Sequence, residues 1–266
     1  TLRGNTSALF TNSTSAESTL TGGNISMDVD GFDINTYGST WANLSSGTYA
    51  AWCWKAGGAA VSNTDGSIAS QVSANVDNGF SVVKWSGNNN VANIGHGLNS
   101  APQIVIRKSL NIPNSWAFDT SAVDGSWDYL FLDTTAAKAN HSSVTAPTST
   151  TFNTSGTSYN SSSMIAYCFH SVAGVSKVGS YTGTGVAGNA QNIGFEPSWI
   201  MLKPTAGLSS WYILDVKRNS FDNYLFANSN ATEGSLNIIN TTSTGFQFTG
   251  AGLNNSGVDI LYYAIA

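Results

Sequence analysis

Charged residues are scarce in this sequence. Only 9% of its 266 residues are Asp, Glu, Lys or Arg, against roughly a quarter in an average soluble domain. The formal net charge is −5, and no run of Lys or Arg occurs. A nucleic-acid surface needs clustered cations that displace counterions from phosphates. We therefore expect no nucleic-acid partner, and a polar surface made mostly of Ser, Thr, Asn and Gly.

Long apolar runs are also missing. No stretch approaches the roughly 20 apolar residues that a membrane-spanning helix requires, so we predict no membrane insertion. The first residues, Thr1-Leu2-Arg3-Gly4, include neither an initiator Met nor the apolar core of a signal peptide. We therefore expect either a processed chain or a piece of a longer one.

Cysteine is nearly absent, with only Cys53 and Cys168 in the chain. A small secreted domain held together by disulfides usually contains more. Both residues lie in apolar, strand-like runs, Ala51–Trp54 and Ala166–Phe169. We therefore predict two buried thiols that act as small hydrophobic residues rather than one disulfide.

Aromatic residues, in contrast, are plentiful: the chain has 8 Trp, 12 Phe and 10 Tyr. Disordered segments rich in Ser, Thr and Gly contain few aromatics, so we expect a folded chain. The length of 266 residues and the hydrophobic content of 41% are sufficient for two or more domains with their own cores.

An internal repeat dominates the sequence. The run Pro102–Lys108 matches Pro197–Lys203, which lies 95 residues later, and Trp116 matches Trp211 at the same spacing. Repeats of this kind indicate copies of one structural unit. We predict full units at residues 79–174 and 175–266.

The first part of the chain repeats only the second half of a unit. Leu9–Ser13 matches Leu225–Ser229, and Tyr49–Trp54 matches Met164–Phe169. Residues 1–54 are thus predicted to be a half-unit that lacks its front half. A half-unit cannot bury its own apolar face, so we expect upstream chain or a neighbouring chain to complete it. This would make the sequence the C-terminal part of a longer chain or part of a circularly offset assembly.

The local patterns predict strands and no helix. Four short segments are β-branched or aromatic and are bounded by turn residues: Phe80–Trp85, Gln103–Lys108, Tyr129–Leu132 and Met164–Phe169. Strands at roughly ten-residue spacing favour a β-sandwich. The predicted fold is therefore all-β, with tandem antiparallel β-sandwich units of lectin or jelly-roll type, each of about 95 residues. Residues 55–78, rich in Gly, Ala and Ser, are predicted as a linker with room for one strand near Ser67–Val72.

Several runs resemble repeat regions of large virion proteins in aquatic tailed bacteriophages. The resemblance begins with Tyr49–Gly58, Val61–Ile68 and Gly79–Val83, and Ile94–Leu98, Ile165–Gly174 and Gly194–Trp199 extend it over nearly the whole chain. It implies tail-fibre, tail-tip or other structural proteins, a place on the virion surface after assembly in the bacterial cytoplasm, and other virion proteins as partners. By analogy it also implies a homo-oligomer, namely a trimer. No catalytic or ligand residue carries over from it.

Unmatched aromatics are the candidates for carbohydrate binding. Trp41, Trp127 and Trp199 have no aromatic counterpart in the other units, so the repeat does not require them. Trp faces can stack on sugars, although packing in a core is the alternative interpretation for each.

Metal binding has one weak candidate. The run Asp28-Val29-Asp30-Gly31-Phe32-Asp33 alternates carboxylates around a Gly, like a calcium loop. The position of the essential bidentate Glu is Tyr37, however, and the matching loops of the other units have no carboxylates. A solvated turn is the alternative, and we expect no metal and no cofactor. The three histidines, His96, His141 and His170, make too thin a ligand set for zinc.

The expected function is non-enzymatic. No nucleophile elbow, phosphate-binding loop or zinc-protease motif occurs in the sequence. We expect a virion structural protein of tail-fibre or tail-tip type that attaches to a host-surface glycan or protein through loops of a rigid sandwich. The alternatives are an architectural capsid-decoration or fibre-shaft protein, and a polysaccharide depolymerase with two facing carboxylates.

Overall fold

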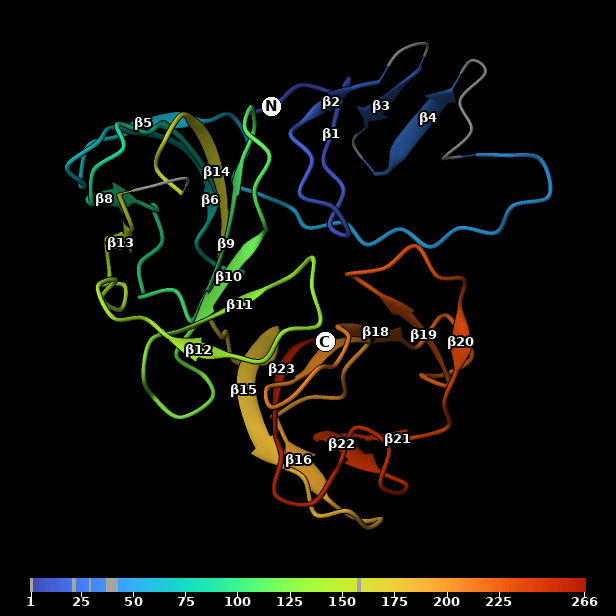
Figure 1. Ribbon diagram of the computed structural model, residues 1–266. Helices are drawn as coiled ribbons and strands as arrows, with labels where there is room; N and C mark the ends of the chain where they lie inside the picture. Colours follow the sequence, from blue (N-terminus) through green and yellow to red (C-terminus); the bar gives the residue numbers. More distant parts are fainter. Residues whose placement is uncertain (1, 21–22, 29, 37–42, 157–158) are drawn as a thin grey trace.

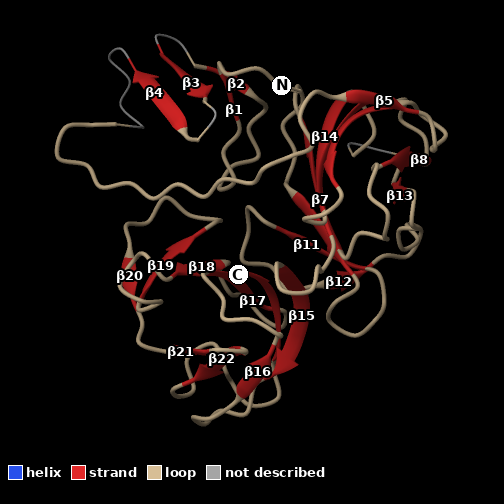
Figure 2. Cartoon of the chain, turned by 180° about the vertical axis from the view of Figure 1, so that it is seen from behind, coloured by secondary structure: helices blue, strands red, loops and turns tan. Residues whose placement is uncertain are grey.

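The structure is a computed structural model that describes residues 2–20, 23–28, 30–36, 43–156 and 159–266 (Figure 1). In these ranges every regular element is a strand, and all strand pairs within the sheets are antiparallel (Figure 2). This confirms the predicted all-β fold, and the arrangement is consistent with β-sandwiches. The described part of the chain contains no helix that could cross a membrane.

The first sandwich has a large sheet with the strand order β12-β11-β10-β9-β14-β7-β6-β5. Its strands are β5 (Val61–Asn63), β6 (Ser70–Asn75), β7 (Phe80–Ser86), β9 (Ile104–Ser109), β10 (Ala117–Thr120), β11 (Asp128–Phe131), β12 (Ala139–Asn140) and β14 (Ser163–Phe169). A second, two-stranded sheet pairs β8 (Ala92–Gly95) with β13 (Thr151–Thr154).

The second sandwich has a large sheet with the order β15-β23-β17-β18-β19-β20. Its strands are β15 (Ser176–Thr182), β17 (Trp199–Pro204), β18 (Tyr212–Asp215), β19 (Asn223–Phe226), β20 (Gly234–Ser235) and β23 (Asp259–Ile265). Its smaller sheet has the order β16-β22-β21, from β16 (Ala190–Asn192), β21 (Ile239–Thr242) and β22 (Gly245–Phe248).

The two large sheets share one topology. Reading β7, β14, β9, β10, β11 and β12 across the first sheet gives the same sequence of positions as β15, β23, β17, β18, β19 and β20 across the second. Matched sequence runs therefore form matched strands. The exact domain boundaries remain a prediction.

Residues 55–78, predicted as a linker with one strand near Ser67–Val72, contain that strand as β6 and one further strand, β5, that the sequence pattern does not predict. Both strands extend the large sheet beyond β7. The reason is the alternation along β6, where Ser70 and Val72 are buried and Gln71 is exposed. When a strand with one apolar face adds to the edge of a sheet, that face is buried. This burial lowers the free energy of the chain relative to a flexible connection.

The N-terminal residues form two hairpins. β1 (Ser7–Ala8) pairs with β2 (Ser18–Thr19), and β3 (Gly23–Met27) pairs with β4 (Phe32–Thr36). The strand expected at Tyr49–Trp54 is absent, and Cys53 is exposed, so that part of the prediction is wrong. Cys168 is buried with a free thiol, as predicted. The difference arises because Cys168 lies in a strand with neighbours on both sides, whereas residues 49–54 have no paired neighbour in the described chain.

Three clusters of buried side chains form the cores. One fills the first sandwich around Phe152, and one fills the second around Phe246. The third lies where all parts of the chain meet, and it includes Phe118 and Trp211 with Trp52 packed against it. The N-terminal residues and the two sandwiches are thus joined by a shared apolar centre, around which Figure 1 shows three lobes.

Candidate functional site

The proposed tryptophan site does not form in the structure. Trp127 and Trp199 are only 8% and 7% exposed, so neither ring offers a face to a sugar. Trp127 packs inside the first sandwich, and Trp199 packs against Trp54 and Tyr263 at the shared centre. The alternative interpretation, packing in a core, therefore holds for both. Trp41 lies outside the described residues.

The candidate calcium loop is an exposed turn between β3 and β4. Asp28 donates its backbone N–H to the carbonyl oxygen of Gly31 at 2.9 Å, which closes the turn. Asp28, Asp30 and Asp33 are all exposed, and no group of three or more His, Cys, Asp or Glu side chains gathers to hold a metal ion within the described ranges. Nothing in this arrangement favours the calcium hypothesis over a solvated turn.

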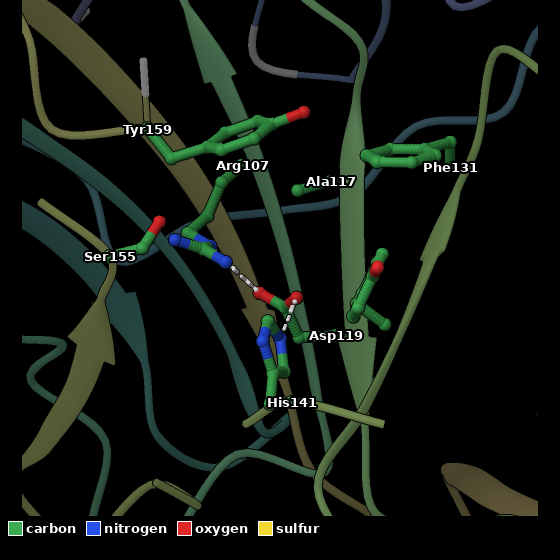
Figure 3. Close-up of a pocket in the computed structure, with 8 residues that line it drawn as sticks. Arg107, Ala117, Asp119, Phe131, His141, Ser155 and Tyr159 are labelled. Carbon is green, nitrogen blue, oxygen red and sulfur yellow. Dashed lines mark hydrogen bonds and ion pairs between the residues drawn. The ribbon is translucent and has the colours of Figure 1, made fainter. Parts of the chain in front are cut away.

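A pocket of about 240 Å³ opens in the first sandwich instead (Figure 3). It is lined by Arg107 on β9, Ala117 and Asp119 on β10, Tyr129 and Phe131 on β11, His141 after β12, and Ser155 and Tyr159 after β13. The register of the sheet explains the grouping, because Asp119 stands directly opposite Tyr129, and Ala117 opposite both Arg107 and Phe131. Residues at alternate strand positions point to the same face. The five strand residues therefore share one face of the sheet.

A buried ion pair forms the base of the pocket. The Nε and Nη2 atoms of Arg107 lie 2.7 and 2.6 Å from Oδ2 of Asp119, and both side chains are 1% exposed. The remaining Arg107 nitrogen, Nη1, donates to the hydroxyl of Thr154 at 2.9 Å. The other carboxylate oxygen, Oδ1, lies 2.9 Å from Nε2 of His141. Both ends of the Asp119 carboxylate are thereby occupied.

Aromatic rings line the pocket above this network. The Tyr159 ring lies over the guanidinium of Arg107, with 5.4 Å between the guanidinium carbon and the ring centroid. Tyr129 packs on the His141 ring at 4.9 Å and on Phe131 at 5.6 Å. Burial raises the pKa of the Tyr159 hydroxyl, so this phenol stays protonated and can donate a hydrogen bond. The pocket thus combines ring faces with a few polar groups, as small-molecule sites do.

The second sandwich is an internal control for this site. Its residues at the positions of Arg107, Asp119 and His141 are Leu202, Leu214 and Leu236. Leu202 and Leu214 are completely buried in the core. The same fold therefore forms without charge at these positions.

Stability alone does not account for this exchange. Replacing a buried ion pair by apolar residues of similar volume is often neutral or stabilising, by about 1–4 kcal/mol. The first unit has a charged network where the second unit has leucine. A function of the pocket explains this difference better than a contribution to stability does.

Sequence reasoning missed this site, although a usable signal was present. Arg107 corresponds to Leu202 in the second unit, and Asp119 corresponds to Leu214. A charged residue in one unit thus replaces an apolar residue in the other, within an otherwise matched repeat. Aromatic residues without a counterpart are a poorer signal in this chain, because Trp127 and Trp199 are both core residues.

A family model matches the whole chain. The chain belongs to the family described as Domain of unknown function (DUF7483), which covers residues 1–266. No curated protein and no solved structure shows significant similarity to it. Membership of DUF7483 assigns the chain to a domain family and names no activity. The pocket is therefore the main structural clue to function.

Proposed function

We propose that this DUF7483 chain is a non-enzymatic attachment module of a bacteriophage particle, and that it binds a host-surface glycan through the pocket of its first sandwich. The phage context rests on the sequence resemblance. The binding role rests on one observation: Arg107, Asp119 and His141 stand where the sister unit has two core leucines, Leu202 and Leu214, and the partly buried Leu236.

The size and walls of the pocket favour a single sugar ring. Its volume of about 240 Å³ lies below the roughly 300–1,000 Å³ of pockets for drug-sized ligands. Tyr129 and Phe131 supply ring faces for the apolar side of a sugar, and His141 and Tyr159 supply hydrogen-bonding atoms for its hydroxyls. We therefore expect a terminal monosaccharide to enter the pocket while the rest of the glycan stays outside.

The charge balance favours a neutral sugar. The positive charge of Arg107 is matched by Asp119, and its three nitrogens are directed to Asp119 and Thr154. Arg107 is the only Lys or Arg among the lining residues of this pocket. A uronic or sialic acid would need an available cation to pair with its carboxylate. Neutral hexoses are the better match.

The same geometry is unfavourable for the depolymerase alternative. A typical glycosidase has two carboxyl groups that face each other across the sugar. Asp119 is the only carboxylate among the pocket's lining residues, and it already pairs with Arg107 and His141. A side chain held in this way serves to orient the pocket rather than to protonate a leaving group.

Screening the purified chain against neutral glycans tests the proposal. Tyr129→Ala should weaken binding about tenfold, because aromatic contacts contribute roughly 0.5–1.5 kcal/mol beyond their buried area. The matched control is Tyr224→Ala, which removes the corresponding tyrosine of the second sandwich and should leave affinity unchanged. A blank glycan screen, or equal effects of the two substitutions, would argue against glycan binding. Release of reducing sugar from host polysaccharide would favour the depolymerase alternative.

The virion location has its own test. Antibodies or mass spectrometry should detect the chain in purified particles, and antibodies should label the outer surface. If the chain is on the particle but binds no glycan, the architectural alternative is preferred.

A further inference from the structure

We propose that β1–β4 together with residues 43–54 form a docking site for a front half-unit, meaning a polypeptide segment with the strand pattern of β15, β16, β17 and β18. Its binding would build a third sandwich. This inference is independent of the glycan pocket.

The N-terminal hairpins have the same registers as the back half of the second sandwich. Ser7 pairs with Thr19 in the β1–β2 hairpin, just as Asn223 pairs with Ser235 in the β19–β20 hairpin. The β3–β4 hairpin likewise reproduces the β21–β22 hairpin, with Ile25 opposite Ile34 as Ile239 is opposite Phe248. These correspondences assign β1–β4 to the positions of β19–β22.

Among the residues that the structure describes, this half-unit lacks the strand neighbours of its counterpart in the second sandwich. β23 lies between β15 and β17, and β19 pairs with β18 as well as with β20. Residues 49–54 occupy the β23 position in sequence but pair with no strand in the described chain, and β1 pairs with β2 alone. Every absent neighbour corresponds to a strand of the front half-unit.

The apolar residues of this half-unit remain accessible as a consequence. Ile239, Phe246 and Phe248 are 2%, 1% and 1% exposed, whereas their counterparts at positions 25, 32 and 34 are only half-buried. Tyr49 is 54% exposed and Cys53 is exposed. An accessible apolar surface of this kind marks a site of association.

The junction between units shows how a front half-unit binds. The indole N–H of Trp116 donates to the carbonyl oxygen of Phe10 at 2.9 Å, and Nζ of Lys108 donates to the carbonyl oxygen of Thr14, also at 2.9 Å. Front-half residues of the first sandwich thus anchor on the back half that precedes it.

The next junction repeats both contacts. Trp211 donates to the carbonyl oxygen of Phe131 at 3.0 Å, and Lys203 donates to that of Thr135 at 3.1 Å. One docking mode therefore occurs twice in the chain. The back half of the second sandwich offers the same positions a third time, at Phe226 and Asn230.

The N-terminal half-unit already lies beside that third set of positions. Thr11 donates its hydroxyl to the carbonyl oxygen of Ala227 at 2.7 Å, and the Trp52 indole donates to Asp215 at 3.1 Å. A front half-unit held by Phe226 could therefore also pair with residues 49–54 and close a ring of three sandwiches around the shared apolar centre. A front half-unit would supply both a strand for residues 49–54 and an indole donor for the carbonyl oxygen of Phe226, as Trp116 and Trp211 do at the other two junctions.

The two cysteines provide a direct probe of docking. Cys53 and Cys168 hold the same position in their units, but Cys168 is completely buried and Cys53 is exposed. A thiol reagent should modify Cys53 rapidly and Cys168 slowly in the native chain. A saturating synthetic peptide spanning residues 175–218 should slow the modification of Cys53 at least tenfold, and should also slow amide exchange over residues 49–54.

The matched control is the same peptide with Trp211→Ala and Lys203→Ala, which lacks both anchors and should not protect Cys53. A fusion that carries a second copy of residues 175–218 ahead of Thr1 repeats the test where the free peptide is insoluble. Unchanged Cys53 reactivity and amide exchange in the folded fusion would overturn the proposal. Protection that instead rises with the concentration of the chain alone would also overturn it, in favour of a second copy as the occupant.

Discussion

The indole nitrogen of Trp211 donates a hydrogen bond of 3.0 Å to the backbone carbonyl oxygen of Phe131, across the boundary between two units. Trp211 is fully buried, and its ring packs on Phe118 at 4.6 Å. Trp116 makes the equivalent bond to Phe10 at 2.9 Å. A repeated tryptophan that looks like a core residue in the sequence is thus also a polar connection between units.

Trp211→Phe should therefore destabilise the chain beyond the loss of ring volume. The substitution removes the donor and leaves the Phe131 carbonyl oxygen unpaired, which costs about 1–3 kcal/mol. Urea unfolding measures the change. The matched control is Trp127→Phe, because the buried Trp127 indole nitrogen has no hydrogen-bond partner in the described chain. Equal destabilisation by both substitutions would contradict a role for the bond.

Substitutions in the Arg107, Asp119 and His141 network should have strongly non-additive effects on the stability of the chain. Arg107→Leu alone should destabilise the chain by about 3–5 kcal/mol, because it leaves the Asp119 carboxylate buried without its partner. The triple substitution Arg107→Leu, Asp119→Leu and His141→Leu copies the second sandwich and should restore or exceed the original stability. It should also abolish glycan binding. Thermal unfolding measures the stability of each variant. A triple variant less stable than Arg107→Leu would contradict the expected restoration of stability.

Lys203 should make stability depend on alkaline pH. Burial lowers the pKa of its ammonium group to about 8 from the usual 10.5, so the unfolded chain binds more protons between these values. Stability linked to this group therefore increases as the pH rises from about 8 to 10.5, by up to about 1.4 kcal/mol per pH unit. Lys203→Met removes the titrating group, so the unfolding free energy of the original chain minus that of the variant should increase over this range. A constant difference would contradict the lowered pKa.

Asn254 should be essential for the β15–β16 loop. Its side chain is fully buried and donates to the carbonyl oxygens of Val186 at 2.7 Å and Gly250 at 2.9 Å. Asn254→Ala leaves both acceptors without this donor and should cost at least about 2 kcal/mol. Amide exchange over the loop, with urea unfolding, measures the effect. Asn255→Ala, at the exposed neighbouring position, should change neither, and a loop that stays protected without Asn254 would show that other contacts hold it.

Much of the fold could be predicted from local pattern. The strand expected at Phe80–Trp85 is β7 (Phe80–Ser86), and the one expected at Met164–Phe169 is β14 (Ser163–Phe169). The same residue pattern at Tyr49–Trp54 forms no strand. A strand's backbone groups must pair with neighbours, so a segment with strand-like residues remains irregular where those neighbours are missing.

The candidate site could not be predicted in the same way. Arg107, Asp119 and His141 are separated in the sequence by 12 and 22 residues, and no motif links residues at such spacings. They meet because β9 pairs with β10 and β10 with β11, and because His141 lies two residues after Ala139, which is opposite Tyr129 on β11.

Composition and repeat were therefore enough to establish an all-β chain with a twice-repeated strand pattern, because alternation along a strand and matched positions are properties of neighbouring residues. Which aromatics are buried, which thiol is accessible and where the charged residues converge depended on contacts between distant strands. Pairing register and the packing of units against one another set those contacts, and neither is encoded in any single segment.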